Sequence, residues 1–221
     1  MVRRLQSAVS RGVSMRMMKK SVMLVGSLCF LLGCAGKGEV VHLNLQGSPS
    51  EELPKVKGAD QVTVAVSWFE DARPDRKYLG VRTHLGGGET HFQSPGGNTG
   101  EAVAKMVRDY LKARGWNVVP ARQGQGAPDV TITGKVQDLS VEAKSRFLGT
   151  DLTAKSKLAV QAKNSSDGST VSLSVFGNGK DTEFWFDPED AQELVNEAIG
   201  KSLEYLVANT RLENRSLRLV E

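Results

Sequence analysis

Two histidines and a glutamate, His84, Glu89 and His91, form the one cluster in the sequence that resembles a set of metal ligands. Imidazole and carboxylate groups bind catalytic zinc, and bound zinc activates water for hydrolysis. The two histidines, however, lie seven residues apart in a glycine-rich segment rather than at the fixed spacing of a helical zinc motif, and no third ligand is near. We therefore expect surface histidines, and a hydrolase or metal protein is the least favoured hypothesis.

The glycine-rich segment itself, HLGGGETHFQSPGGNTG, precedes a predicted helix whose N-terminus would attract an anion. No Gly-Lys-Ser/Thr follows, and the spacing of a dinucleotide-binding loop is missing, so we expect a mobile crossover loop. No serine lies in a Gly-x-Ser-x-Gly elbow, and Glu70 and Asp71 lie beside Arg73, which favours an ion pair over an acid–base couple. The sequence predicts no enzyme and no cofactor.

The thiol of Cys34 has the clearest predicted chemistry. Lys19 and Lys20 precede an apolar run, 21–32, which ends at Gly33 immediately before the cysteine. That run is too short to span a hydrocarbon layer of about 30 Å, which takes about 20 helical residues. A basic start, an apolar core and a small final residue are the parts of an export signal. We predict a signal peptide over 1–33, cleaved between Gly33 and Cys34, with translation starting at Met1 or at a later methionine, Met15, Met17 or Met18.

The four residues Leu31-Leu32-Gly33-Cys34 resemble the lipobox of bacterial lipoproteins. The resemblance implies that Cys34 is acylated, with palmitate among its fatty acids, and becomes the amino terminus of the mature protein. No aspartate follows Cys34, which by the same resemblance implies the outer membrane, with the domain facing the periplasm. Several acyl chains would hold the protein firmly where one chain would not. No other part of the chain is needed for attachment.

Loss of the leader changes the charge and removes the cysteines available for a site. The leader holds six of the 29 basic residues and none of the 25 acidic ones, so the net charge falls from +4 to −2. A basic chain favours nucleic-acid binding, but here the excess lies in the leader, so we exclude nucleic acid as a partner. Cys29 lies in the leader and Cys34 is acylated, which leaves no disulfide, thiolate site or zinc cluster.

Hydrophobic periodicity predicts a single α+β domain at 58–212, between a flexible tether at 34–57 and a C-terminal tail at 213–221. The tether includes a candidate short strand, VVHLNL. Helices are expected from the cap Asn98 to Gly115, and from the cap Asp187 to about Asn209. The predicted order of elements along the chain is β-α-β-β-β-β-α. It predicts a mixed, mostly antiparallel sheet with both helices on one face.

Each predicted element has an apolar side that should form the core. The first strand alternates Val62, Val64, Val66 and Trp68, and the first helix carries an apolar stripe. A hairpin turning at Asp167-Gly168 should turn its lysines outward. We also expect the aromatic triplet FWF, 184–186, to pack under the last helix. The inward set of the first hairpin strand is Leu152, Ala154, Leu158, Val160 and Ala162, opposite Lys155, Lys157, Gln161 and Lys163.

A partner could contact the segment EDARPDRKYLGVR, which follows the end of a strand. Arginine and tyrosine are enriched at interfaces, and loops at strand ends commonly carry function. The candidate partner-binding residues are Arg73, Arg76, Tyr78 and Arg82. The alternative is a solvated, charged loop.

Several phrases of the sequence resemble the YajG-type family of bacterial outer-membrane lipoproteins. They are VTVAVSWFEDARPDRKYLGV, VAKMVRDYLKARGWNVV and PDVTITGKVQDLSVEAK, with the hairpin and the final amphipathic helix. The resemblance covers residues 59–210 and implies an envelope location, and it carries over no enzymatic role. A more distant likeness is to envelope lipoprotein domains that activate peptidoglycan synthases or build curli export pores. The glycine-rich segment departs from the family pattern.

These observations favour a lipid-anchored, non-enzymatic envelope lipoprotein that binds or supports another periplasmic or outer-membrane component. The alternative is an accessory subunit of a peptidoglycan-synthesis or secretion machine. No small-molecule substrate is predicted.

Replacing Cys34 with Ser should abolish incorporation of radiolabelled palmitate, because the acyl acceptor is the cysteine sulfur. Gel fluorography of labelled cells is the measurement, and Cys29→Ser is the matched control that should keep its label. Equal labelling of the Cys34→Ser chain would contradict the predicted anchor.

Overall fold

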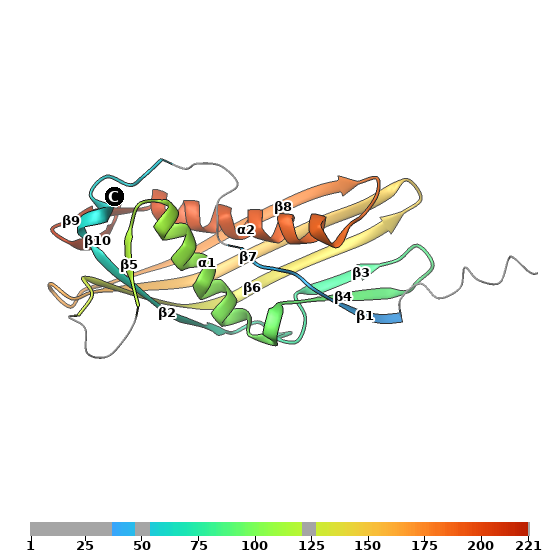
Figure 1. Ribbon diagram of the computed structural model, residues 1–221, viewed down its shortest axis with the longest axis horizontal. Helices are drawn as coiled ribbons and strands as arrows, with labels where there is room; N and C mark the ends of the chain where they lie inside the picture. Colours follow the sequence, from blue (N-terminus) through green and yellow to red (C-terminus); the bar gives the residue numbers. More distant parts are fainter. Residues whose placement is uncertain (1–36, 47–53, 121–126, 221) are drawn as a thin grey trace, which may run out of the picture. The chain divides into compact units, whose positions relative to one another are not determined.

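The computed structural model describes residues 37–46, 54–120 and 127–220 (Figure 1). The predicted signal peptide, Cys34 and the predicted cleavage site lie outside these residues. The elements, in chain order, are β1 (Lys37–His42), the short 3-10 helix η1 (Ala59–Gln61), β2 (Thr63–Asp71), β3 (Gly80–Thr83), β4 (Glu89–Gln93), η2 (Pro95–Gly97), α1 (Thr99–Ala113), β5 (Asn117–Val119), β6 (Val130–Arg146), β7 (Gly149–Asn164), β8 (Thr170–Glu183), α2 (Pro188–Ala208), β9 (Thr210–Glu213) and β10 (Ser216–Leu219).

The long strand β6 organises the main sheet. Along one edge it pairs antiparallel with β7, which in turn pairs antiparallel with β8. Along its other edge it pairs in parallel with β2 through its first half and with β3 through its second half. Strand β5 extends the sheet beside β2, and β4 and then β1 extend it beside β3. A separate hairpin is formed by β9 and β10.

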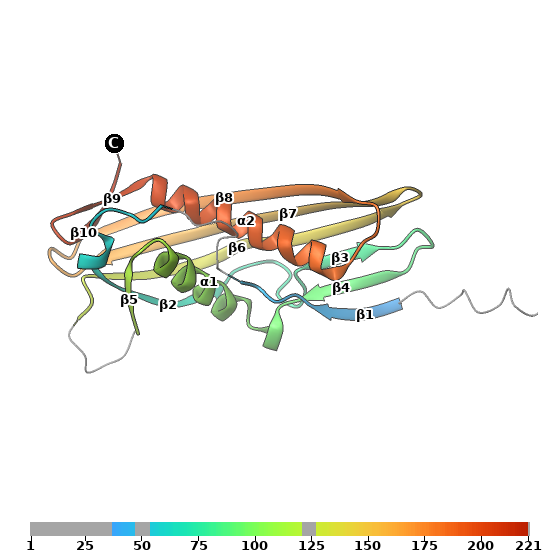
Figure 2. The same ribbon diagram turned by 45° about the horizontal axis from the view of Figure 1, so that its top comes forward.

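Both helices cover one face of this sheet. Helix α1 packs on β2, and α2 packs on β7 and β8, as Figures 1 and 2 show. The chain therefore has the predicted fold class, α+β with a mixed, mostly antiparallel sheet and two helices on one face. Within the described residues, no helix is long and apolar enough to span a membrane.

The predicted core is confirmed along β7 and α1. On β7, every inward residue predicted from Leu152 to Ala162 is buried, while Lys155, Lys157 and Lys163 are exposed. A pleated strand alternates its faces, so one side packs against the helices and the other meets water. The predicted apolar stripe of α1 is buried as well, comprising Val103, Met106, Val107, Tyr110 and Leu111.

The predicted helix caps are also present. The Asn98 side chain accepts a hydrogen bond from the backbone N–H of Glu101, and Gly115 ends α1 with φ of 87°. At α2, Asp187 accepts from the N–H of Glu189 while the Asp190 side chain accepts from the N–H of Asp187. These caps satisfy backbone groups that have no partner within the helix.

A β-bulge changes which aromatic side chain of β2 enters the core. The register between β2 and β6 shifts between Val66 and Phe69, so Phe69 is fully buried and Trp68 is 61% exposed. An extra residue on one strand reverses the alternation beyond it. The prediction that Trp68 continues the inward row from Val62 was therefore wrong.

Segments that we expected to be irregular contribute strands. The glycine-rich segment contains β4, which forms a hairpin with β3, so only its turn and its approach to α1 lie outside a strand. In the predicted tether, where a short strand was a candidate at 40–45, β1 covers Lys37–His42, and Leu43 and Leu45 are buried. The predicted tail contains β10. Strand β1 pairs with the distant β4, and Leu43, Phe92 and Leu217 from the three segments lie in the core. Local sequence patterns do not record such long-range contacts.

The β9–β10 hairpin docks on the sheet through a carboxylate, that of Asp129. Arg215 donates hydrogen bonds to both Asp129 oxygens, at 3.0 and 2.9 Å. The N–H and hydroxyl of Thr63 donate to Asp129 Oδ2 at 2.8 and 2.7 Å. The bonds from Arg215, opposed by burial and aided by those from Thr63, lower the pKa of Asp129 to about 2.

Asp129→Asn should lower the free energy of unfolding by about 1–3 kcal/mol at neutral pH, because charge-assisted bonds are lost. A carboxyl whose pKa falls on folding stabilises above its unfolded pKa, here 3.8, and loses that contribution as the pH falls toward about 2. The difference between wild type and variant should therefore shrink over that range in urea titrations. Asp60→Asn, at an exposed site, is the control. A difference that is constant with pH would contradict this assignment.

Candidate functional site

Arg73, one of the candidate partner-binding residues, is buried, with 5% of its surface exposed. Its Nε and Nη2 donate to the two Asp71 oxygens, each at 2.9 Å. Its Nη1 donates to the backbone carbonyls of Tyr78 and Leu139 at 2.9 and 3.2 Å. Nη2 also donates to the Thr99 hydroxyl at 2.9 Å. Arg73 thus joins the β2–β3 connection to β6 and α1, and it is not available to a partner.

The Asp71 carboxylate completes this buried ion pair. Burial raises the pKa of Asp71, but the hydrogen bonds from Arg73 outweigh that effect and the pKa is lowered. A carboxylate held ionised by a bidentate guanidinium is a poor general base. The predicted ion pair between these two residues is therefore present, with a structural role.

The remaining three candidates do not share a surface. Arg76 is exposed, and the Tyr78 ring stacks on the His91 ring with centroids 4.3 Å apart. Arg82 instead lies on the helix-covered face, with its Cζ 4.0 Å from the centroid of the Phe186 ring. Burial lowers the pKa of Arg82. The candidate set is therefore divided between the interior, the loop surface and the two faces of the sheet.

The His84, Glu89 and His91 cluster is divided in the same way. His84 Nε2 is hydrogen bonded to Thr90 Oγ1 at 2.8 Å, and Thr90 is buried on the helix-covered face. Glu89 and His91 precede and follow Thr90 on β4, so their side chains point to the opposite face. Among the described residues, no group of three His, Cys, Asp or Glu side chains is arranged to hold a metal ion.

The aromatic triplet after β8 is only partly in the core. Phe186 packs on the core beside Phe92, with ring centroids 6.2 Å apart. Phe184 is 67% exposed and Trp185 is 83% exposed. The prediction that all three pack under α2 was wrong, because the chain bends away from the sheet after Glu183 before α2 begins.

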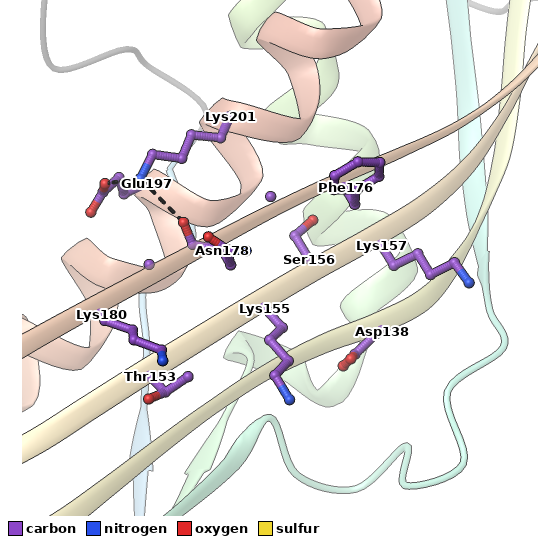
Figure 3. A pocket seen from close by; sticks show the side chains of 12 residues that line it. Asp138, Thr153, Lys155, Ser156, Lys157, Phe176, Asn178, Lys180, Glu197 and Lys201 are labelled. Atoms are coloured by element: carbon purple, nitrogen blue, oxygen red, sulfur yellow. Dashed lines mark hydrogen bonds and ion pairs between the residues drawn. The ribbon is translucent and has the colours of Figure 1, made fainter.

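A groove of about 650 Å³ runs along the edge strand β8, lined by residues of the uncovered face and, on the other side of β8, by Glu197 and Lys201 of α2. Figure 3 shows Lys155, Lys157 and Lys180 projecting from β7 and β8, with Asp138 beside them and Glu197 on α2. Thr153, Lys155 and Lys157 are alternate residues of β7, so their side chains share one face. Lys180 of β8 lies on the same face because it pairs with Thr153. We call Lys155, Lys157 and Lys180 the lysine face. Within the described part of the chain, none of the three has a carboxylate within ion-pair distance.

The side chains of this groove are suited to binding an acidic partner. Three ammonium groups can donate hydrogen bonds and attract an acidic surface. Two hydroxyl groups line the groove: Thr153 lies on the lysine side, and Ser156 is buried on the other face, where it accepts a hydrogen bond from Ser202 at 3.0 Å. The sequence predicted outward lysines on β7, but their combination with Lys180 and the exposed Phe176 depends on the β7–β8 register. Sequence reasoning therefore missed the site.

A second groove, of about 560 Å³, lies between β2, α1 and β5. It is lined by the displaced Trp68, by Val118 and Pro120, and by Arg108 and Lys112 of α1. Arg108 is engaged in an ion pair with Glu101 at 2.8 Å. This groove therefore offers less uncompensated charge than the lysine face.

Comparison with known proteins identifies related sequences and structures. A family model described as "Uncharacterized lipoprotein" matches residues 49–215. No curated protein matches the chain. A solved protein from Xanthomonas campestris is 12% identical, with 78% of this chain and 93% of that chain covered and a TM-score of 0.44. Lipoprotein GNA1162 from Neisseria meningitidis is 13% identical, with 67% and 99% covered and a TM-score of 0.35. The PelC dodecamer from Paraburkholderia phytofirmans is 13% identical, with 69% and 93% covered and a TM-score of 0.31.

Arg73→Ala should lower the free energy of unfolding by about 3 kcal/mol, because it leaves the Asp71 carboxylate and two backbone carbonyls without their donor. Arg76→Ala, at an exposed position in the same loop, should change it by less than about 0.5 kcal/mol. Urea unfolding measures both. Equal stability of the two variants would show that Arg73 is not the structural residue that its contacts indicate.

Proposed function

The chain belongs to the uncharacterized lipoprotein family whose model it matches over residues 49–215, and on that basis we propose a lipid-anchored, non-enzymatic protein that binds another envelope component. Attachment is through the acylated Cys34. Binding is through the lysine face. The finer assignments, to the YajG-type family, to the outer membrane and to the periplasm-facing side, remain predictions from the sequence.

The observation that carries this proposal is the lysine face on the uncovered side of the sheet. Helices α1 and α2 bury one face of the sheet, so the other face is free for a partner within the described part of the chain. Lys155, Lys157 and Lys180 project from that face, and Lys157 pairs with Phe176, whose exposed ring has its centroid 5.4 Å from that of the Tyr205 ring of α2. An exposed aromatic side chain beside charged groups matches the centre and rim of a protein interface. The lysines favour an acidic partner.

The other two hypotheses have less support. A hydrolase or metal protein would need His84, Glu89 and His91 together, and the structure places their side chains on opposite faces of β4. An accessory role in peptidoglycan synthesis or secretion is compatible with the proposal, since it names a particular partner for the same surface. No contact of a described residue favours it over other envelope partners.

A photo-crosslinking residue at Lys157, the central lysine, should capture a partner in intact cells. The triple change of Lys155, Lys157 and Lys180 to Glu should abolish capture by a crosslinker placed at the neighbouring Phe176. Reversed charges repel an acidic surface, so binding is lost while the exposed positions keep the fold intact. Mass spectrometry of the crosslinked band identifies the partner.

The matched control replaces Lys55, Lys57 and Lys112, three exposed lysines away from the lysine face, with Glu. It changes the net charge equally and should leave capture intact. If both triple variants crosslink equally well, or if a crosslinker at the exposed Glu204 of α2 captures the same protein, the lysine face is not the binding surface.

A further inference from the structure

Five large apolar side chains are exposed at three chain turns. They are Leu85, Phe147, Leu148, Phe184 and Trp185, with exposed fractions of 67%, 87%, 73%, 67% and 83%. We call these five residues the apolar rim. Leu85 lies in the β3–β4 turn, Phe147 and Leu148 form the β6–β7 turn, and Phe184 and Trp185 follow β8.

Strand register brings the three turns to one end of the sheet. Lys37 pairs with Glu89, Glu89 with Thr83, and Thr83 with Lys144. The same row continues from Lys144 to Asp151 and from Asp151 to Thr182. Immediately beyond this row lie the turns that carry the rim. Figures 1 and 2 both show the β3–β4 turn, the β6–β7 turn and the end of β8 at one end, together with the start of β1.

The fold does not require apolar residues at these positions. A two-residue hairpin link, such as the one between Arg146 and Gly149, favours small or polar residues, yet it holds Phe147 and Leu148. In the triplet after β8, Phe186 supplies the core contact. Phe184 and Trp185 contact each other edge to face, with centroids 5.4 Å apart, and remain exposed. Clustered exposed apolar residues on a soluble domain mark an interaction surface.

The start of β1 indicates what lies against that surface. Lys37 belongs to the same row of paired residues and is separated from Cys34 by two residues, Ala35 and Gly36, so the two Cα atoms are at most about 11 Å apart. If the sulfur of Cys34 carries the lipid, the bilayer lies at the rim end. Trp and Phe favour the interface between headgroups and acyl chains, where an apolar ring can be buried beside polar groups.

We propose that the apolar rim inserts into the headgroup region of the bilayer that holds the acylated Cys34, and so fixes the orientation of the domain. The proposal rests on the lipid anchor of the proposed function. The acyl chains supply attachment, and the rim supplies a second, weaker contact. In this orientation β7 and β8, which carry the lysine face, extend away from the membrane surface.

The charges around the rim indicate which lipids suit it. Arg146 is paired with Asp151 at 2.9 Å, so it is largely neutralised. Glu183 lies beside Asp190, whose negative charge raises the pKa of Glu183. The row beside the rim also holds Lys37 and Lys144 with Glu89 and Asp151, so charges of both signs surround the rim and we expect zwitterionic lipid to be accepted.

The test uses the mature, acylated protein reconstituted into phosphatidylcholine vesicles, with and without bromine on the acyl chains. Bromine quenches tryptophan on contact. A Trp68→Phe chain retains two tryptophans, Trp185 and the buried Trp116. Its Trp185 emission should be mostly lost in brominated vesicles. A Trp185→Phe chain keeps Trp68 and Trp116 and should keep its emission.

Two further variants test the rest of the rim. Phe147→Ser with Leu148→Ser, introduced into the Trp68→Phe chain, should weaken quenching of Trp185. The matched control is Phe176→Ser, at an exposed aromatic residue outside the rim, and it should leave quenching unchanged.

The outcomes separate this proposal from the anchor itself. Protein that does not float with vesicles in a density gradient overturns the anchor and the rim contact together. Protein that floats while Trp185 escapes quenching overturns the rim contact alone. If Trp185 is shielded from aqueous acrylamide yet not quenched by bromine, the rim contacts a second copy or another protein, and the proposal is wrong.

Discussion

The pairing register of β6 is the constraint on which the rest of the structure depends. From Val130 opposite Asn164 to Arg146 opposite Gly149, β6 and β7 run antiparallel with one irregularity, and a two-residue link closes the hairpin. A slip of one residue would turn the outward lysines of β7 toward the core and the leucines toward water. The same register fixes where β8 ends, where β3 begins and which turns lie together. Both proposed surfaces, the lysine face and the apolar rim, follow from it.

The buried ion pair of Arg73 and Asp71 acts at the point where β6 changes its neighbour. Strand β2 accompanies the first half of β6 and β3 the second half, and the connection between them must cross this junction. Arg73 satisfies backbone carbonyls on both sides of the junction, those of Tyr78 and Leu139. Because arginine is enriched at interfaces, the sequence suggested Arg73 as a partner contact, yet its hydrogen bonds are internal. Its role in the fold leaves the uncovered face as the better binding surface.

Sequence patterns predicted the elements with strong local signals. The caps at Asn98 and Asp187, the left-handed Gly115 and the alternation along β7 depend on near neighbours, and all are present. Features that depend on distant strands were not predicted. The β2 bulge that exposes Trp68 and the pairing of β1 with β4 are set by partners far along the chain. The groove joins residues of β6, β7, β8 and α2, so no short motif could reveal it.

The chain belongs to a lipoprotein family, one sheet face bears lysines without an ion-pair partner among the described residues, and an apolar end lies beside the start of β1. Together these observations support the proposal of an oriented, membrane-anchored binding protein. Its central claim is that orientation. Oxidative footprinting of the acylated protein in vesicles, compared with the same protein in detergent, tests it residue by residue. The account predicts protection of Phe147, Phe184 and Trp185, while Phe176 and Leu219 stay reactive. Protection at Leu219, near the opposite end of the sheet, with a reactive Trp185, would contradict it.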